Sequence, residues 1–141
     1  HPHGFEIDPE IIDSARANAR DSGGSFEVSH EFEEALSDAD VVFPRSWVSA
    51  ELSRTGVAAF GVDREIELHN KHKDWRLEQR HASEFMSNEG IVMHVLPAFR
   101  GEEVTDEVLE GPNSVIYDQA RDNFHAKMAV LASTMAEDIS F

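Results

Sequence analysis

The chain has 141 residues, 40% of them hydrophobic and 28% charged, which predicts one soluble globular domain with its own core. Asp and Glu number 28 against 12 Lys and Arg, and the formal net charge of −16 argues against a nucleic-acid partner because it repels phosphates. No apolar run is long enough to span a bilayer, and we expect a cytoplasmic protein with no membrane partner. The lack of cysteine excludes a disulfide framework, a zinc-thiolate site and a thiol nucleophile.

The acidity itself has two interpretations of about equal weight. A high acid content with only three lysines is typical of a protein kept soluble in concentrated salt. An ordinary acidic domain of the cytoplasm has the same composition. Neither interpretation concerns chemistry.

The first part of the chain predicts a helix, a short strand and a second helix. Asp8 is a helix N-cap followed by proline at the first helical position, and Gly23 and Gly24 end the helix. A strand over Ser25–Ser29 and a helix over Glu31–Leu36 follow. After them the pattern predicts strands at Ala39–Phe43, Ile91–Val95 and Ser114–Tyr117, helices at Trp75–Met86, Thr105–Leu109 and Gln119–Ala136, and no clear element over Ser46–Gly61.

Strands and helices alternate, and the strands are short and apolar, which predicts an α/β fold: a three-layer, Rossmann-like parallel sheet with helices on both faces. Ligands of such folds bind at the carboxyl ends of the strands. The candidate site loops therefore follow Phe43, Val95 and Tyr117.

Each of these loops carries polar chemistry, although each by itself also fits a purely structural role. The loop after Phe43 offers Arg45, Ser46, Trp47 and Ser49, which suit an anionic or polar small molecule. His94, at the end of its strand, suits a general acid or a hydrogen-bond donor.

The helix after Tyr117 offers an anion-binding N-terminus. His69 and His72 lie three residues apart, but Lys71 and Lys73 disfavour a metal ion, so a solvated helix face is the better interpretation. We expect no metal.

Taken together, the three loops carry a family resemblance. Residues 94–104 read HVLPAFRGEEV and resemble the H-C-L-P-A-x-R-G-E-E-V signature of ornithine-type carbamoyltransferases. Residues 105–115 resemble the same family's T-D-E-V-(hydrophobic)-x-G-P-x-S-V segment, and Asp118-Gln119-Ala120 with His125 match part of its D-Q-A-E-N-R-x-H segment. The segments HPHGF, Gly23-Gly24 and 34–42 follow in family order, so the resemblance covers nearly the whole chain.

Two segments resemble one branch of the family. Residues 43–47 read FPRSW, similar to a Y-P-K-S-W version, and residues 72–75 read HKDW. Both are similar to the branch related to acetylornithine and succinylornithine carbamoyltransferases, whose chain carries a deep knot in this half. The knot is implied by this resemblance alone, since knots are nearly absent from proteins.

The resemblance implies transfer of a carbamoyl group from carbamoyl phosphate to the amine of an amino-acid-like acceptor, with no cofactor, in a homotrimer. Residues 1–141 resemble the second, acceptor-binding domain. On this view the domain is incomplete at its N-terminus, and the first domain with its S-T-R-T phosphate loop lies outside the chain. We therefore expect this fragment alone to be inactive.

The resemblance also implies site residues. His94 would help to polarise the carbamoyl oxygen, the carbonyls of Val95 and Leu96, turned by Pro97, would receive the carbamoyl NH₂, and the loop from Arg45 to Ser49 would hold the charged end of the acceptor. Arg121 is expected as a catalytic residue in place of the family's carbamoyl-phosphate arginine. Two more substrate-binding positions carried over from the family are Arg100 and Asn123.

Two departures from the family pattern concern the substrates. Val95 replaces the Cys of ornithine enzymes, which leaves a backbone role. Arg45 replaces the Asp of their D-x-x-x-S-M-G motif and would repel a diamine such as ornithine. We therefore predict an acceptor whose far end is neutral or acidic.

A third departure leaves a second hypothesis open. Asn123 occupies the place of the family's carbamoyl-phosphate Arg, and Arg121, two residues away, is about 200° around a helix from it. The chain then belongs either to an active carbamoyltransferase, which we favour, or to a degenerate homologue that binds a ligand or partner without turnover. A coincidental motif in an unrelated α/β domain is the weakest alternative, because three motifs stand in the right order.

Overall fold

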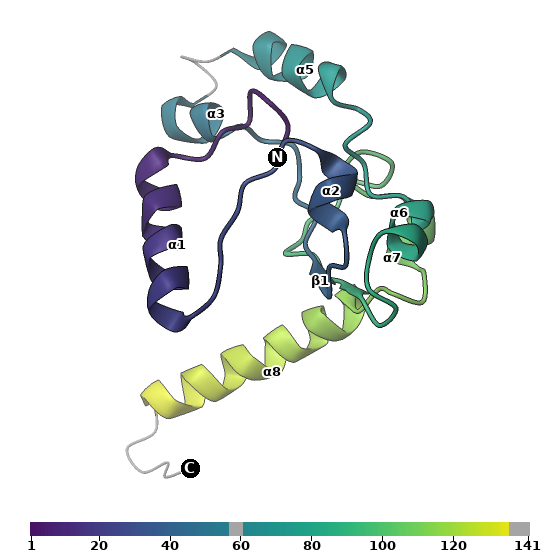
Figure 1. The fold of residues 1–141 in the computed structure, drawn as a ribbon. Helices are drawn as coiled ribbons and strands as arrows, with labels where there is room; N and C mark the ends of the chain where they lie inside the picture. The colour runs from purple at the N-terminus through teal and green to yellow at the C-terminus, as the bar shows by residue number, and fades with distance from the viewer. Residues whose placement is uncertain (57–60, 136–141) are drawn as a thin grey trace.

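The computed structural model describes residues 1–56 and 61–135. Among these residues no helix combines the length and the apolar character needed to cross a membrane. Figure 1 shows α1 on one side of the molecule and α6 and α7 on the other, with β1 between them. The helices are α1 (Pro9–Ser22), α2 (Phe32–Leu36), α3 (Ala50–Thr55), α5 (Val62–Lys71), α6 (Gln79–Glu84), α7 (Asp106–Leu109) and α8 (Ile116–Met135), and the strands are β1 (Val41–Val42) and β2 (Ile91–Val92).

The start of α1 is where the capping pattern places it. The Asp8 side chain accepts a hydrogen bond from the Glu10 N–H at 3.0 Å, and Pro9 occupies the first helical position. Gly23 ends the helix with a φ of 78°, a left-handed conformation that glycine adopts without strain. The predicted first helix is confirmed.

A small parallel sheet organises the centre of the fold. β1 pairs with β2 in parallel register, Val41 opposite Ile91 and Val42 opposite Val92. On its other side β2 binds the segment before α8: the Val92 N–H donates to the Asn113 carbonyl at 2.7 Å, and the Val115 N–H donates to the Val92 carbonyl at 3.0 Å. The α/β class with a parallel sheet is therefore confirmed.

Two predicted strands differ from the structure. The strand expected over Ser114–Tyr117 is reduced to a single bridge between Val92 and Ser114, because α8 begins at Ile116. The strand expected over Ser25–Ser29 is irregular, since within the described ranges no strand lies beside it to supply hydrogen bonds.

The helix expected over Trp75–Met86 is also shorter. Leu77 is held in an extended segment, because its N–H donates to the Glu103 carbonyl at 2.9 Å and its carbonyl accepts from the Thr105 N–H at 3.0 Å. The helix α6 therefore begins only at Gln79, after a capping box between Glu78 and His81. The stretch without a predicted element contains α3, and its residues 57–60 lie outside the described part of the chain.

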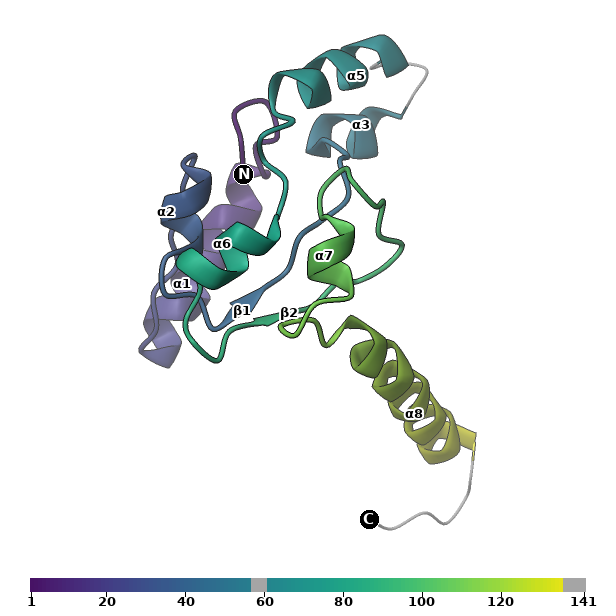
Figure 2. The ribbon, with the colours of Figure 1, turned by 90° about the vertical axis from the view of Figure 1, so that its right-hand side faces the viewer.

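The core lies between β2 and the helices α6 and α7. Its fully buried apolar residues are Leu36, Leu77, Ala82, Met86, Val92, Val104, Val108, Leu109 and Ile116. Helix α8 contributes only its first residue to this core, and Figures 1 and 2 show the helix leaving the body of the molecule. The predicted apolar stripe of this helix is exposed at Phe124, Met128, Leu131 and Met135, and the predicted last residue, Ala136, lies outside the described residues.

Candidate functional site

The three candidate loops meet at the carboxyl end of the parallel strands. The Ser46 hydroxyl donates to the Pro97 carbonyl at 3.0 Å and so joins the loop after β1 to the loop after β2. The His94 N–H donates to the Gln119 side-chain oxygen at 2.9 Å and so joins the loop after β2 to the first turn of α8. Residues about 50 and 25 positions apart along the chain are thereby brought to one edge of the sheet, as expected for a parallel sheet.

His94 is buried and uses both ring nitrogens inside the protein. Its Nδ1 accepts the Leu96 N–H at 2.9 Å, so the ring proton lies on Nε2, which is 3.1 Å from the Glu103 Oε1. In this arrangement neither nitrogen is free for a substrate atom. The ring faces Glu103 and the backbone, and the polarising role expected for His94 stays a prediction.

The backbone just after His94 is exposed and unusual in shape. Val95 and Leu96 are exposed side chains, and Leu96 has a φ of 58°, in the left-handed region that a bulky residue rarely adopts. The Leu96–Pro97 peptide bond is cis. The side chains of Val95 and Leu96 thus lie at the surface, and the Pro97 carbonyl accepts the Ser46 hydroxyl.

The loop after β1 contains Arg45, which has no ion pair among the described residues, and Ser49, whose hydroxyl is hydrogen-bonded within the protein. Arg45 is exposed and makes no ion pair with the described residues. Ser49 is fully buried, where its hydroxyl donates to Glu65 Oε2 at 2.8 Å and accepts the Leu52 N–H at 3.1 Å as the N-cap of α3. Arg45 is therefore available to a ligand, whereas Ser49 holds α3 against α5.

Trp47 forms the base of the same loop. Its ring packs against His69 at a centroid distance of 4.8 Å and against Phe5 at 5.1 Å. His69, on α5, also lies 3.1 Å from Glu102. His69 and Trp47 thus pack together next to the loop after β2, and His72 caps the end of α5.

Arg100 is bound within an ionic cluster on the surface. Its guanidinium donates to Asp106, to Glu110 at 2.6 Å and to the Tyr117 hydroxyl at 3.1 Å. The Arg100 hydrogen bond, followed by that from Tyr117, lowers the pKa of Glu110. Arg100 thereby ties the loop after β2 to α7 and to the start of α8.

Arg121 and Asn123 lie on the exposed part of α8. The Arg121 guanidinium is 2.8 Å from Asp118 and 3.2 Å from Asp122, and the hydrogen bond that Arg121 donates to Asp122 raises the pKa of Arg121. Asn123 is exposed on the same helix. Neither residue contacts the loops after β1 and β2 through a hydrogen bond within the described ranges.

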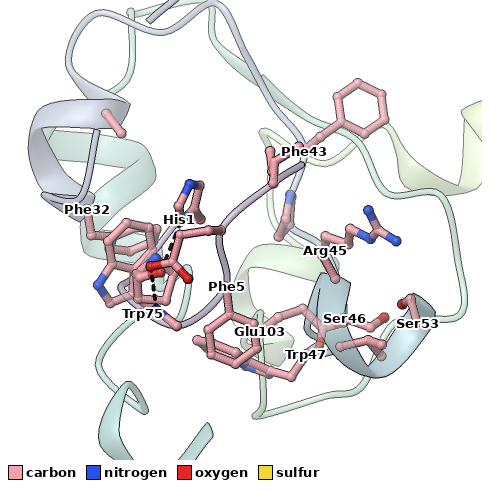
Figure 3. Close-up of a pocket in the computed structure, with 18 of the residues that line it drawn as sticks. His1, Phe5, Phe32, Phe43, Arg45, Ser46, Trp47, Ser53, Trp75 and Glu103 are labelled. Carbon is pink, nitrogen blue, oxygen red and sulfur yellow. Dashed lines mark hydrogen bonds between the residues drawn. The ribbon is translucent and has the colours of Figure 1, made fainter. Parts of the chain in front are cut away.

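A cavity of about 1080 Å³ lies beside the loop after β1. Figure 3 shows Arg45, Ser46 and Trp47 along one side of it, with Phe32, Trp75 and His1 on the other side and Glu103 between them. The open edge of β1 borders this cavity, since Val42 and Phe43 line it. Its walls are largely aromatic and aliphatic, and charged or polar residues line it both near Arg45 and near His1.

Three residues that organise the site are absent from the sequence-predicted set: Glu103, Glu65 and Gln119. Glu103 and Gln119 stand inside the segments that carry the resemblance, so those segments contained the signal. Glu65 is one of several acidic residues on α5, and no pattern in the sequence distinguishes it. Its contact with Ser49 depends on the packing of two helices.

Comparison with known proteins agrees with this architecture. The ornithine carbamoyltransferase of Thermococcus kodakarensis is 42% identical over an alignment of 140 residues, which covers 95% of this chain and 39% of that protein. The solved ornithine carbamoyltransferase of Pyrococcus furiosus superposes with a TM-score of 0.75 at 37% identity, over 93% of this chain and 39% of the other.

A second solved structure, an acetylornithine transcarbamylase complexed with acetylcitrulline, superposes with a TM-score of 0.78 at 26% identity, over 94% of this chain and 37% of the other. The chain thus spans about two fifths of the length of such relatives. The family described as aspartate/ornithine carbamoyltransferase, Asp/Orn binding domain, matches residues 1–134. The chain belongs to this family.

Proposed function

We propose that this chain is the acceptor-binding domain of a carbamoyltransferase, in which an amine attacks the carbonyl carbon of carbamoyl phosphate. In that reaction the C–N bond forms, the bond from carbon to the phosphate oxygen breaks, phosphate leaves with the electron pair, and the amine loses a proton. The observation that carries the proposal is the meeting of the Val95–Pro97 backbone with the Arg45–Ser46 loop through the Ser46 hydroxyl. Holding two substrates at one edge supplies the proximity that such a reaction needs.

The backbone of Val95 and Leu96 would bind the carbamoyl group, and the loop that contains Arg45 would bind the acceptor. The carbonyls of Val95 and Leu96 would accept the two N–H groups of the carbamoyl NH₂ and so orient its carbonyl carbon toward the amine. A preformed carbonyl pair performs this task without reorganising when charge develops. Arg45 would hold the far end of the acceptor.

We further propose that the acceptor has a neutral or acidic far end and is not free ornithine. Arg45 is exposed at the rim of the cavity, makes no ion pair with the described residues, and would repel a second ammonium group. The similar structure complexed with acetylcitrulline supports an acylated acceptor, whereas relatives named ornithine carbamoyltransferase support ornithine. The charge at Arg45 decides our preference.

The test is a carbamoyl-transfer assay of the full-length protein with ornithine, N-acetylornithine and N-succinylornithine. We expect turnover of an acylated compound and at least about tenfold less of ornithine, since one unfavourable contact of about 1.4 kcal/mol has that effect. The variant Arg45→Asp should reverse the preference, and Arg20→Asp on α1 is the matched control. Efficient use of ornithine by the unaltered protein would contradict the proposed acceptor.

One observation favours a second candidate, a degenerate homologue without turnover. Arg121 is engaged by Asp118 and Asp122, and Asn123 stands where the family has its carbamoyl-phosphate arginine. Titration calorimetry of the full-length protein with carbamoyl phosphate, together with sedimentation, separates the two candidates. An intact trimer that binds no carbamoyl phosphate supports the degenerate homologue, and micromolar binding supports the enzyme.

A further inference from the structure

Glu103 is a buried carboxylate at the centre of the loop after β2. The residue is 2% exposed, and its Oε1 accepts the Phe99 N–H at 2.8 Å and faces His94 Nε2 at 3.1 Å. Its Oε2 is buried and has no hydrogen-bond partner among the described residues. A buried carboxylate with half of its acceptors unused is a poor source of stability, which points to another reason for its place here.

Both ends of the segment Leu96–Phe99 are connected to this one carboxylate. Phe99 is bound to it directly, and Leu96 is bound through the ring of His94, whose Nδ1 accepts the Leu96 N–H at 2.9 Å. The ring can accept that N–H only when its proton lies on Nε2, and the carboxylate at Nε2 favours this tautomer. Glu103 therefore sets both the orientation of the His94 ring and its tautomer, with the proton on Nε2.

The conformation of Leu96 makes these connections necessary. Its φ of 58° is unfavourable for a leucine, and such backbone persists only where neighbouring groups over-determine it. The N–H bound to His94 belongs to Leu96 itself, and the Ser46 hydroxyl holds the next residue by its carbonyl at 3.0 Å. Without the imidazole in place, the backbone of Leu96 would lower its energy by changing to a negative φ.

We infer that Glu103 is a positioning residue for carbamoyl transfer: acting through His94, it holds the carbonyls of Val95 and Leu96 in the orientation that receives the carbamoyl group. This inference rests on the proposed function. It replaces a direct role of His94 on the substrate with a role through the Leu96 N–H. A displacement of the carbonyls by about 1 Å is enough to slow such a reaction about 100-fold.

The test uses the full-length protein and five variants. Glu103→Leu removes both connections, and we expect kcat to fall about 100-fold with a smaller change in KM for the acceptor. Glu103→Gln keeps an acceptor oxygen and should recover most of the rate. Glu107→Leu is the matched control, since the Glu107 side chain is exposed on α7 and its loss should leave kcat unchanged.

The fourth variant separates positioning from direct catalysis. His94→Asn retains an oxygen close to the place of Nδ1, so it can still accept the Leu96 N–H although it offers no imidazole proton. We expect it to keep substantially more activity than His94→Leu, with the pH profile of kcat unchanged. Equal loss in both His94 variants would overturn the inference in favour of a direct role.

Amide hydrogen exchange provides a readout that does not depend on turnover. In Glu103→Leu the Leu96 and Phe99 amides should exchange faster, while the Val92 amide, which donates to Asn113 in the core, stays protected. Unchanged exchange at Leu96 and Phe99 would overturn the inference. If the unaltered protein transfers no carbamoyl group but these amides respond, the proposed function fails while the structural role of Glu103 stands.

Discussion

The loop after β2 and the first turns of α8 each carry a residue expected to act on carbamoyl phosphate, namely His94 and Arg121. The two residues differ in burial and in their partners. His94 is buried, and both of its ring nitrogens are bound within the protein. Arg121 is exposed on a helix that leaves the body of the molecule, where two aspartates of its own helix accompany it. A buried side chain with fixed partners shapes the backbone, whereas an exposed one with surface ion pairs can exchange those partners for a ligand.

The difference teaches that the two expected catalytic residues depend on different parts of the protein. The two partners of the His94 ring, Leu96 and Glu103, both lie within residues 94–103. Among the described residues, the ion-pair partners of Arg121 are Asp118 and Asp122, and both belong to α8. The predictions below test this contrast from the largest effect to the smallest.

Removing the buried imidazole should have the largest effect. We expect His94→Ala to lower the free energy of unfolding by about 3–5 kcal/mol, because it leaves a cavity and removes the partner of both Glu103 Oε1 and the Leu96 N–H. Urea unfolding followed by circular dichroism measures this loss. His125→Ala, the same change on the exposed face of α8, is the control, and equal losses in both variants would erase the contrast.

The loop after β1 extends the comparison to a buried hydroxyl. Ser49→Ala removes the N-cap of α3 and the hydrogen bond to Glu65 Oε2, so we expect a loss of about 1–2 kcal/mol in the free energy of unfolding. Ser53→Ala, at an exposed position of the same helix, should change it by less than about 0.5 kcal/mol. A neutral Ser49 variant would mean that Glu65 finds another donor.

A second buried histidine offers a comparison in pH dependence. Burial, followed by the charge of Arg80, lowers the pKa of His81 below its ordinary 6.5, and its Nδ1 accepts the Glu78 N–H at 3.0 Å. As the pH falls below the unfolded pKa, the unfolded chain therefore binds more protons at His81 than the folded chain does. The contribution of His81 to stability is present above about pH 6.5 and is lost as the pH falls below it.

The variant His81→Asn keeps an acceptor for the Glu78 N–H but has no titrating ring. Between about pH 7 and about pH 5, its free energy of unfolding should fall less steeply than that of the unaltered protein. Thermal melts across this range measure the slope. A parallel pair of curves would show that His81 titrates alike in the folded and unfolded chains.

The smallest effect is expected on α8. Arg121→Ala breaks only exposed ion pairs with Asp118 and Asp122, so the free energy of unfolding should change by less than about 1 kcal/mol, and less still in concentrated salt. The measurement is urea unfolding at low and high salt. A loss above about 2 kcal/mol would mean that Arg121 stabilises the fold, as we expect of His94.

Local signals predicted the parts of the fold that depend on neighbouring residues. The Asp8 cap, the Gly23 end of α1 and the apolar run at Ile91–Val92 are of this kind. The strand Ser25–Ser29 was mispredicted because a strand needs a hydrogen-bonding partner, which local sequence does not report. The late start of α6 was missed for the same reason, since the pairing of Leu77 with Val104 joins residues 27 positions apart.

The candidate site divides in the same way. The meeting of the three loops follows from the parallel sheet, which the sequence predicted. The environment of each side chain did not follow, because the burial of His94 and the pairing of Arg100 with Glu110 depend on tertiary packing. A motif identifies which residues stand in a loop, while packing decides whether a side chain or its backbone faces the substrate.

The open edge of β1 has a practical consequence for anyone producing this chain. Among the described residues only β2 pairs with β1, and the side chains of Val41 and Phe43 are about half exposed. An unpaired strand edge flanked by apolar side chains is a template for strands of other molecules, so residues 1–141 on their own are prone to aggregate.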